Sequence, residues 1–512
     1  MIHPRLILSI LTLCAFPAFA DVKLPACFGD HMVLQRDMKI PVWGTAEAGE
    51  KVQATLGKET LSATATADGK WRVDFAPLKV GEPLALTVTG KNTVAFKDVL
   101  VGEVWLASGQ SNMDFTVAKT EKYYFCGTMN EAEEVAAADH PLIRMFTADW
   151  TMRAEPQSDV VGTWKVCTPE SVREFSAVAY FFARDIQKEL GVPVGVLTCT
   201  YGASTAQAWI SREALAAQAE IKPMLDAIDV AREKFATDAN AAAGYERATK
   251  RWEETAAKAK ADGGKAPRRP KNPDPIQDQH NATVLYNGMI APIIPYAMRG
   301  ALWYQGESNT SDARPYPTLQ NTLITDWRNR WAQGDFPFYL VQLASNNAPK
   351  PEPGNSRLAS MREAQGASLK LPNTGMAVTI DIGDEKNVHP KNKQDVGHRL
   401  ARIALAQTYG KKVEFSGPML DSAKVEGGTV RVKFTHAAGL TAKGGTLKQF
   451  AIAGADKAFV WADAKIEGDS VIVSSATVPA PAYVRYAWAD FPEDCNLYNG
   501  DGLPAAPFRT DP

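Results

Sequence analysis

A serine placed directly after an apolar run is the first residue in this chain whose type and position suit covalent chemistry. Residues 101–108 are mostly apolar, and Gly109, Gln110 and Ser111 follow at once. Glycine permits a tight turn at the end of a buried strand, and such a turn exposes the Ser111 hydroxyl as a nucleophile. Because a serine hydroxyl needs a base to accept its proton, a histidine and oxyanion donors should be found elsewhere.

Four further apolar runs end in polar, turn-forming residues. We expect fully buried strands over residues 194–200, 300–304, 338–343 and 375–380. Ligands of an α/β sheet gather at the carboxyl ends of its strands, so the residues that follow these runs are candidate site residues. They are residues 201–204, 305–309, 345–347 and 381–390, and the last of these segments contains His389.

The elements that must position these residues follow from the patterning around them. Between residues 98 and 409 strands alternate with helices, such as an amphipathic helix over 175–190 with Ser176 as N-cap and Gly191 after its end. Short alternating runs separated by glycine turns come before and after this region. The sequence predicts an α/β domain over residues 101–410, a β-sandwich over 21–100 and a second β-sandwich over 411–512.

Aromatic residues of the two β-regions have two interpretations. Trp43 and Trp71 at one end, and Trp461, Tyr483, Tyr486 and Trp488 at the other, could stack against sugars. Core or interdomain packing is the commoner fate of such residues in β-domains.

Residues 211–279 form an insertion that the α/β sheet does not need. It is rich in Ala, Glu and Lys, with helical runs near 212–218 and over 227–260, and a loop at 263–270. The functional interpretation is a lid or wall of the substrate cleft, and the alternative is a solvated helical hairpin. The short basic stretch at 265–270 lacks interleaved aromatic residues and does not indicate a nucleic-acid site.

The first 20 residues have the pattern of a secretory signal. Arg5 precedes an apolar stretch over residues 6–16, and Ala18-Phe19-Ala20 fits the small-x-small cleavage rule. We therefore expect the protein to be exported to the periplasm or the extracellular space. The apolar stretch is too short to span a bilayer, and no insertion into the membrane is expected.

Composition excludes several other classes of function. The 512-residue chain has a formal net charge of −2 and 22% charged residues, which gives no reason to expect nucleic acid or an anionic membrane as a partner. Five cysteines follow the signal segment, widely spaced and free of CxxC or Cys/His clusters: Cys27, Cys126, Cys167, Cys199 and Cys495. This pattern predicts neither a metal site nor a disulfide framework, although one or two bridges are compatible with export. We expect no cofactor, and the sequence does not indicate an oligomeric state.

Three blocks of the chain resemble the signature blocks of the sialate O-acetylesterase family, a branch of the SGNH hydrolases. The blocks are residues 109–113, 303–309 and 381–390, with further likeness at 32–36, 285–289 and 502–505. The resemblance covers nearly the whole chain after the signal segment. It implies an SGNH-type three-layer α/β/α core and the removal of acetyl groups from a carbohydrate such as sialic acid, xylan or xyloglucan.

The resemblance also implies catalytic roles. Ser111 would attack the ester carbonyl, and His389 would take its proton and return it to the departing sugar hydroxyl. The wider SGNH pattern has an aspartate three residues before the histidine, where this chain has Lys386. Asp384 is our choice to orient His389, with Asp381 or a backbone carbonyl as alternatives and a turn-capping role as the competing interpretation of Asp384.

Oxyanion donors are expected at three places. The backbone amides of Ser111 and Gly202 are natural choices, because glycine lets the main chain approach a ligand. By resemblance, the third donor is a side-chain amide, Gln305 with Asn309 as the alternative. Glu307 and Asn112 are expected to support the site or bind substrate. For Glu307 the reason is that a carboxylate next to an oxyanion would oppose the reaction.

Three functions are compatible with these features. The first is an exported carbohydrate O-acetylesterase that uses Ser111 and His389. The second is a hydrolase of another ester or amide with the same mechanism, and the third is a sugar-binding protein with an inactive site.

Overall fold

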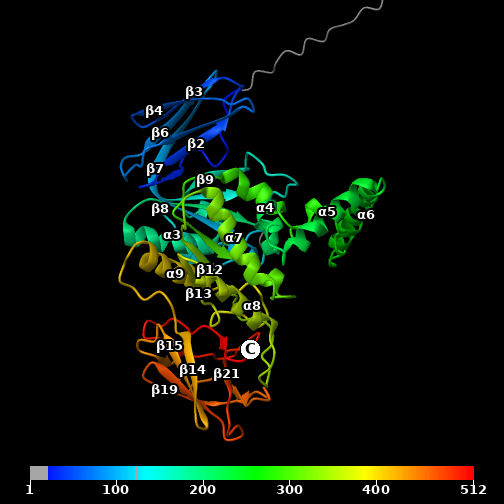
Figure 1. The fold of residues 1–512 in the computed structure, drawn as a ribbon. Helices are drawn as coiled ribbons and strands as arrows, with labels where there is room; N and C mark the ends of the chain where they lie inside the picture. Colours follow the sequence, from blue (N-terminus) through cyan, green and yellow to red (C-terminus); the bar gives the residue numbers. More distant parts are fainter. Residues whose placement is uncertain (1–20, 122–123) are drawn as a thin grey trace, which may run out of the picture.

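The computed structural model describes residues 21–121 and 124–512. β-rich regions lie at both ends of an elongated molecule, with a mixed α/β region between them (Figure 1). The predicted signal segment, residues 1–20, lies outside the described residues.

A seven-strand path forms the central sheet of the α/β region. Its strand order is β13-β12-β11-β7-β10-β8-β9, and all neighbours are parallel except β8 and β9. The strands are β7 (Thr93–Gly109), β8 (His140–Ala148), β9 (Gly162–Cys167), β10 (Val194–Thr200), β11 (Gly300–Tyr304), β12 (Phe338–Val341) and β13 (Thr374–Ala377). The predicted strands therefore form, although β12 and β13 end before the predicted residues 343 and 380.

Strand β7 lies at the point where the chain changes direction across the sheet. The chain builds β8 to β10 on one side of β7 and then β11 to β13 on the other. Such a switch point leaves a crevice at the carboxyl ends of the strands. The end of β7 carries Ser111, so the topology places the candidate nucleophile at the crevice.

Helices cover both faces of this sheet. Along β7, Trp105 and Ala107 belong to one buried cluster, and Val104 and Leu106 belong to the other. Helix α3 (Ala177–Leu190) packs with α9 (Lys393–Ile403) on the first cluster, and α7 (Tyr316–Trp331) and α8 (Arg357–Gly366) contribute to the second. The alternation of side chains across a parallel strand accounts for the three layers. The predicted α/β/α architecture is confirmed.

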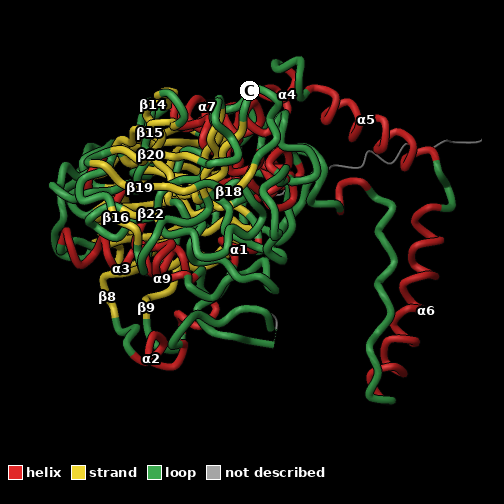
Figure 2. Tube along the Cα trace, turned by 90° about the horizontal axis from the view of Figure 1, so that it is seen from below, coloured by secondary structure: helices red, strands yellow, loops and turns green. Residues whose placement is uncertain are grey.

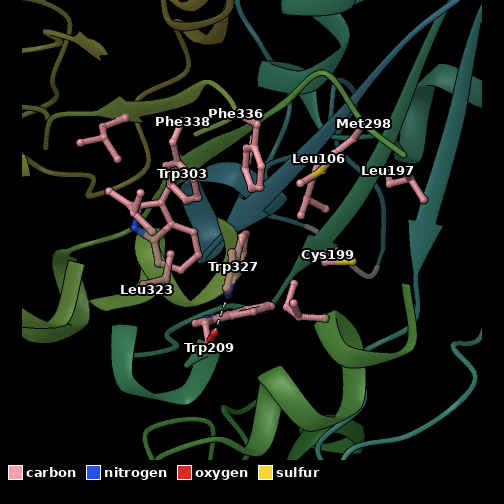
Figure 3. Packing of buried hydrophobic residues seen from close by; sticks show 14 of the residues in the cluster. Leu106, Leu197, Cys199, Trp209, Met298, Trp303, Leu323, Trp327, Phe336 and Phe338 are labelled. Atoms are coloured by element: carbon pink, nitrogen blue, oxygen red, sulfur yellow. Dashed lines mark hydrogen bonds between the residues drawn. The ribbon is translucent and has the colours of Figure 1, made fainter. Parts of the chain in front are cut away.

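A group of tryptophans on one face of the sheet holds the loop that follows β10. Trp209 and Trp327 each meet Trp303 edge to face, at 6.0 and 5.8 Å between ring centroids. The Trp327 indole N–H donates to the Trp209 carbonyl at 3.0 Å (Figure 3). Trp209 ends the short helical turn η2 (Ala206–Trp209), so this packing fixes the chain just beyond residues 201–205.

The N-terminal β-region is joined to the central sheet by one long strand. Its other strands are β1 (Val33–Gln35), β2 (Ile40–Thr45), β3 (Lys51–Leu56), β4 (Glu59–Thr64), β5 (Lys70–Phe75) and β6 (Leu84–Thr89). The first part of β7 pairs with β6, and its second part pairs with β1, β10 and β11. The predicted boundary between residues 100 and 101 therefore falls inside β7.

Aromatic residues of the N-terminal β-region pack inside the protein. Trp71 is buried, and the half-buried Trp43 contacts Phe28 and Tyr296 at centroid distances of 4.8 and 6.5 Å. Tyr296 belongs to the α/β region, so Trp43 contributes to packing between the two regions.

The C-terminal region contains two four-stranded sheets. Their orders are β14-β15-β20-β19 and β18-β17-β21-β23, with a separate β16-β22 pair. The strands are β14 (Met419–Glu426), β15 (Thr429–Thr435), β16 (Thr441–Ala442), β17 (Phe450–Ala453), β18 (Val460–Trp461), β19 (Asp463–Glu467), β20 (Ser470–Ser474), β21 (Tyr483–Tyr486), β22 (Leu497–Tyr498) and β23 (Phe508–Arg509). Tyr486 and Trp488 are buried, whereas Trp461 is exposed.

The insertion begins packed against α7 and continues outward as an arm. It contains α4 (Arg212–Ala216), α5 (Lys222–Thr237) and α6 (Ala241–Ala261), so the predicted continuous helix over 227–260 is wrong. The interruption lies at Asp238, whose extended backbone ends α5. α6 buries none of its side chains, and it projects away from the body of the molecule (Figure 2). This arrangement favours the solvated hairpin over a lid.

Candidate functional site

The turn that presents Ser111 depends on Gly109. Gly109 ends β7 with φ +139°, and a Cβ atom built on it would lie 2.1 Å from the Tyr304 carbonyl oxygen. A side chain at this position would therefore collide with strand β11. The next residue, Gln110, donates its amide to the same carbonyl at 3.0 Å, and Ser111 begins the short helix α1 (Ser111–Asp114).

His389 contacts the Ser111 hydroxyl directly. The His389 Nε2 atom lies 2.8 Å from Ser111 Oγ, which is hydrogen-bond distance for proton transfer. The ring of Phe125 packs on the imidazole with a centroid separation of 4.6 Å. The His389 amide donates to Asn387 Oδ1 at 2.9 Å and holds the loop at this residue. The structure thus brings together the two residues that the sequence assigned as nucleophile and base.

The surroundings of His389 favour its neutral form. Burial, followed by the positive charge of Lys393, lowers the His389 pKa from 6.5 to about 4. A neutral imidazole has a free lone pair at Nε2 when Nδ1 carries the hydrogen, and it can then accept the Ser111 proton. At neutral pH, His389 is therefore in the protonation state that a general base needs.

Asp384 occupies a turn-capping position. Its Oδ1 atom accepts hydrogen bonds from the backbone amides of Lys386 and Asn387, at 2.8 and 3.2 Å. Within residues 21–121 and 124–512, the hydrogen bonds of Asp384 do not include the His389 ring. These contacts match the competing interpretation, in which Asp384 shapes the loop and does not orient the imidazole directly.

Asp381 is engaged by a different partner. Both of its carboxylate oxygens pair with the Arg399 guanidinium, at 2.7 and 2.8 Å, and Oδ2 also accepts from the Tyr498 hydroxyl at 3.2 Å. Arg399 lies on α9 and Tyr498 lies in the C-terminal β-region. Asp381 therefore ties the end of the sheet to both of these elements, and this geometry does not support it as the partner of His389.

Two backbone amides next to Ser111 Oγ are candidate donors to an oxyanion. A Cβ atom built on Gly202 would lie 3.8 Å from the Ser111 Cβ, so the Gly202 main chain passes beside the nucleophile. The Tyr201 amide donates to the Gly109 carbonyl at 3.0 Å and fixes this approach. Ser111 is the first residue of α1, and an amide at a helix start has no acceptor within the helix. Both amides can therefore act as donors.

The Gln305 side chain is used inside the protein. Its Nε2 atom contacts the Ser204 carbonyl at 3.0 Å, Asn309 Oδ1 at 2.8 Å and Gln110 Oε1 at 3.2 Å. Gln305 is fully buried, and these acceptors take both of its amide hydrogens. The contacts do not favour the predicted role of Gln305 as third oxyanion donor.

The alternative donor, Asn309, is engaged as well. Its Nδ2 atom donates to Gln207 Oε1 at 3.1 Å, and its Oδ1 atom accepts from the Ala206 amide at 3.0 Å. Gln110 accepts from the backbone amides of Gly306 and Ser308. Together with Gln305 and Asn309, it holds the loops that follow β7, β10 and β11 in fixed positions relative to one another. Their role in this geometry is support of the site.

A chain of polar side chains beside Ser111 joins the buried Asn112 and Lys393 to the partly buried Glu307. Asn112 Nδ2 donates to Glu307 Oε1 at 2.5 Å and to the Val388 carbonyl at 3.0 Å, and Asn112 Oδ1 accepts from Lys393 Nζ at 2.6 Å. Burial raises the pKa of Glu307 and lowers the pKa of Lys393 to about 7. Sequence reasoning missed Lys393, because a lysine on an amphipathic helix is normally expected to face solvent.

A small cavity adjoins Glu307 and Val388. Its volume is about 140 Å³. The Glu307 Oε2 atom is buried without a hydrogen-bond partner within the described part of the chain. The cavity is lined by Glu307, Thr310, Leu343, Ala344, Asn346, Asn347, Leu358 and Val388. The lining offers polar atoms to a small ligand next to Val388, the residue before His389 in the sequence.

Residues 21–121 and 124–512 contain neither a metal-binding cluster of side chains nor a membrane-spanning helix. No group of three or more His, Cys, Asp or Glu side chains there could hold a metal ion. No helix in residues 21–121 and 124–512 has the length and apolar character needed to cross a membrane. The five cysteines of these residues are buried and free.

Similarity to a known carbohydrate acetylesterase extends over nearly the whole chain. A crystal structure of a carbohydrate acetylesterase from Xanthomonas citri is 35% identical, with a TM-score of 0.80, and the match covers 96% of this chain and 100% of that one. Residues 272–406 match the family described as carbohydrate esterase, sialic acid-specific acetylesterase. The chain belongs to the sialate O-acetylesterase family.

More distant relatives of this esterase match over their whole length. The sialate O-acetylesterase of Rattus norvegicus is 28% identical over 99% of this chain and 98% of its own. The sialate O-acetylesterase of Homo sapiens is 28% identical over 99% of this chain and 97% of its own. The esterase is therefore a carbohydrate O-acetylesterase with a fold shared along the chain.

Proposed function

We propose that the esterase removes an acetyl group from a sugar hydroxyl through an acyl-enzyme on Ser111. The observation that carries this proposal is the 2.8 Å contact between Ser111 Oγ and His389 Nε2 at the crevice of the central sheet. A serine hydroxyl next to a neutral, partly buried imidazole is the arrangement that nucleophilic ester cleavage requires.

The reaction proceeds in two halves. Ser111 Oγ attacks the acetyl carbonyl as His389 Nε2 takes the hydroxyl proton, and the amides of Ser111 and Gly202 donate to the oxyanion. The tetrahedral intermediate then breaks the bond to the sugar oxygen, which takes the proton from His389 and leaves as a hydroxyl. Water attacks the acetyl-Ser111 ester in the same way, with His389 as base, and acetate departs.

The lining of the cavity that adjoins Val388 supports a neutral sugar as the substrate. Its lining includes the Glu307 carboxylate, and among the described residues that line it there is no lysine or arginine. A sialic acid carries its own carboxylate, and a cation would be needed to compensate it. A neutral sugar carries no charge that requires such compensation.

Export is part of the proposal. The sequence of residues 1–20 supports it through one arginine, an apolar stretch and a small-residue cleavage site. An acetylated plant polysaccharide is too large to enter a cell intact, so deacetylation outside the cytoplasm suits such a substrate.

Acetate release tests this function. The purified protein is assayed on acetylated xylan, acetylated xyloglucan and O-acetylated sialic acid, with Ser111→Ala in parallel. We expect kcat/KM on a neutral acetylated oligosaccharide to exceed that on sialic acid by at least about tenfold, which is ~1.4 kcal/mol of transition-state binding. A preference for sialic acid would contradict the neutral-sugar assignment.

The same assay separates the other two functions. Fluorophosphonate labelling of the wild type but not of Ser111→Ala, together with cleavage of simple aryl esters alone, would indicate a hydrolase of non-carbohydrate esters. Absence of both labelling and acetate release would indicate a sugar-binding protein with an inactive site.

A further inference from the structure

Lys393 is a fully buried lysine close to the nucleophile. It is the first residue of α9 and is 0% exposed. Its Nζ atom lies 2.6 Å from Asn112 Oδ1 and 4.7 and 5.4 Å from the ring centroids of Phe115 and Tyr304. Burial of an ammonium group carries a large desolvation penalty. A smaller apolar residue would avoid this penalty, so a lysine at this position indicates a function for its amino group.

The contacts of Asn112 allow only one orientation of its amide. Lys393 Nζ can only donate, so it requires the Asn112 oxygen. Glu307 Oε1 and the Val388 carbonyl require the Asn112 nitrogen, which lies 2.5 and 3.0 Å from them. A flipped amide would set NH₂ against the ammonium group and a carbonyl against two oxygens. Lys393 and Glu307 therefore specify the Asn112 rotamer from opposite sides.

Val388 is the residue immediately before His389, so its carbonyl is part of the peptide bond that leads into the histidine. Asn112 in turn follows Ser111 directly. The Asn112 amide thus joins the chain at the nucleophile to the chain at the base, and only a fixed amide can hold that separation.

We infer that Lys393 is a positioning residue for His389, which it acts on through Asn112 and the Val388 carbonyl. This inference rests on the proposed roles of Ser111 and His389. Within the described residues, Lys393 does not contact either of them through a hydrogen bond. Its role is to fix the geometry of the pair.

The charged groups around Lys393 support the same arrangement. The titratable groups around Lys393 are Glu307, Cys126, His389 and Tyr304. The pKa of Lys393 is lowered by burial and raised by the Glu307 and Cys126 groups. The positive charge of Lys393 also lowers the pKa of His389. Removal of this charge should therefore raise the His389 pKa.

Four variants test the inference: Lys393→Met, Asn112→Ala, the double variant and Lys391→Met. Methionine keeps the length and apolar stem of lysine but cannot donate or carry charge. Lys391 is exposed and lies two residues away, so Lys391→Met controls for a changed lysine in the same segment. We expect Lys393→Met to lower kcat about 100-fold with little change in KM, the scale of a misplacement of about 1 Å at the reacting atoms.

The double variant distinguishes action through Asn112 from simple filling of the core. If Lys393 acts through Asn112, Lys393→Met adds less than about twofold to the loss caused by Asn112→Ala. Independent losses that multiply would overturn the inference, and so would a Lys393→Met enzyme with wild-type kcat. The double variant leaves no amide oxygen unpaired at Lys393, so it remains a test if Lys393→Met alone does not fold.

Histidine titration gives a readout that does not depend on turnover. In protein labelled with ¹³C at histidine Cε1, with His389→Gln used for assignment, Lys393→Met should raise the His389 pKa, because it removes the positive charge that lowers it. Lys391→Met should leave it unchanged. An unshifted His389 pKa in Lys393→Met would overturn the inference even in an active enzyme. Failure of acetate release by the wild type would instead reject the proposed function, and the titration would still report on Lys393.

Discussion

His389 Nε2 lies 2.8 Å from Ser111 Oγ although 278 positions of sequence separate the two residues. Ser111 is held by the turn at the end of β7, and His389 is held by the loop before α9. The sheet order, with β7 central and β13 at its edge, requires the loop after β13 to reach back to the crevice. The order of the strands in the sheet therefore brings Ser111 and His389 together.

His389→Gln should remove nearly all esterase activity. Glutamine cannot take the Ser111 proton, so we expect kcat to fall by about 10³-fold or more, with KM little changed. Acetate release from an acetylated oligosaccharide measures the effect. His398→Gln is the matched control, because His398 lies on the exposed face of α9 and pairs with Asp185. Equal losses in the two variants would contradict the assignment of His389 as base.

The pH dependence of kcat/KM should have its acid limb near pH 4. His389 must be neutral to act as base, and burial together with Lys393 lowers its pKa to about 4. Activity is therefore present above this pKa and is lost as pH falls through it. An acid limb near the ordinary histidine value of 6.5 would show that the imidazole is not desolvated in the working enzyme.

The free energy of unfolding should decrease as pH falls and His389 becomes protonated. The folded-state pKa of His389 lies below its ordinary value of 6.5, so the unfolded chain binds more protons between pH 6.5 and 4. The contribution of His389 to the free energy of unfolding is therefore lost progressively over that window as pH falls. Urea unfolding of the wild type and His389→Gln at several pH values measures it, and parallel pH profiles would contradict it.

Asp384→Asn should be a mild variant. An asparagine Oδ1 atom can accept the amides of Lys386 and Asn387 as the aspartate does, so the turn should survive and kcat/KM should fall by less than about tenfold. Asp384→Ala, which cannot cap the turn, should lose more. Where a carboxylate orients the catalytic histidine, the change to asparagine costs roughly 10⁴-fold. A loss of that size would restore Asp384 as the partner of His389.

Asp490 links the C-terminal β-region to the loop that lines the cavity. Its carboxylate accepts from Ser356 Oγ and Asn347 Nδ2, and its carbonyl accepts from the Asn346 amide at 3.2 Å. Asn346 Nδ2 in turn donates to the Asp384 carbonyl at 2.9 Å. The cavity loop and the His389 loop are therefore braced from the C-terminal region.

Asp490→Ala should loosen this loop and weaken substrate binding. We expect KM for an acetylated oligosaccharide to rise about tenfold while hydrolysis of a small aryl acetate changes less, because the loop lines the sugar side of the site. Glu493→Ala is the control, since its exposed carboxylate lies in the same segment. A similar KM change in both variants would mean that the effect is not specific to the Asp490 contacts.

Local patterns in the sequence were enough to predict the main strands and one helix. The apolar run over residues 194–200 forms β10 because a parallel strand covered on both faces needs an uninterrupted apolar stretch. Ser176 caps α3 by accepting the Ala179 amide, as its position before an amphipathic run indicated. The insertion was harder to predict, because polar helices carry no signal for the break at residues 238–240.

The sequence by itself indicated the two residues that we propose as nucleophile and base, and the sheet edge at which they meet, because strand ends and glycine turns are local features. Only the tertiary structure decided what surrounds them. Asp384, Asp381 and Gln305 each have the chemistry for a catalytic part, yet their contacts lie with a turn, with Arg399 and with neighbouring loops. From the sequence, Lys393 would be expected at the surface, whereas in the structure it is buried and contacts Asn112. Hydrogen-bond partners depend on how distant segments pack, and no local pattern encodes that packing.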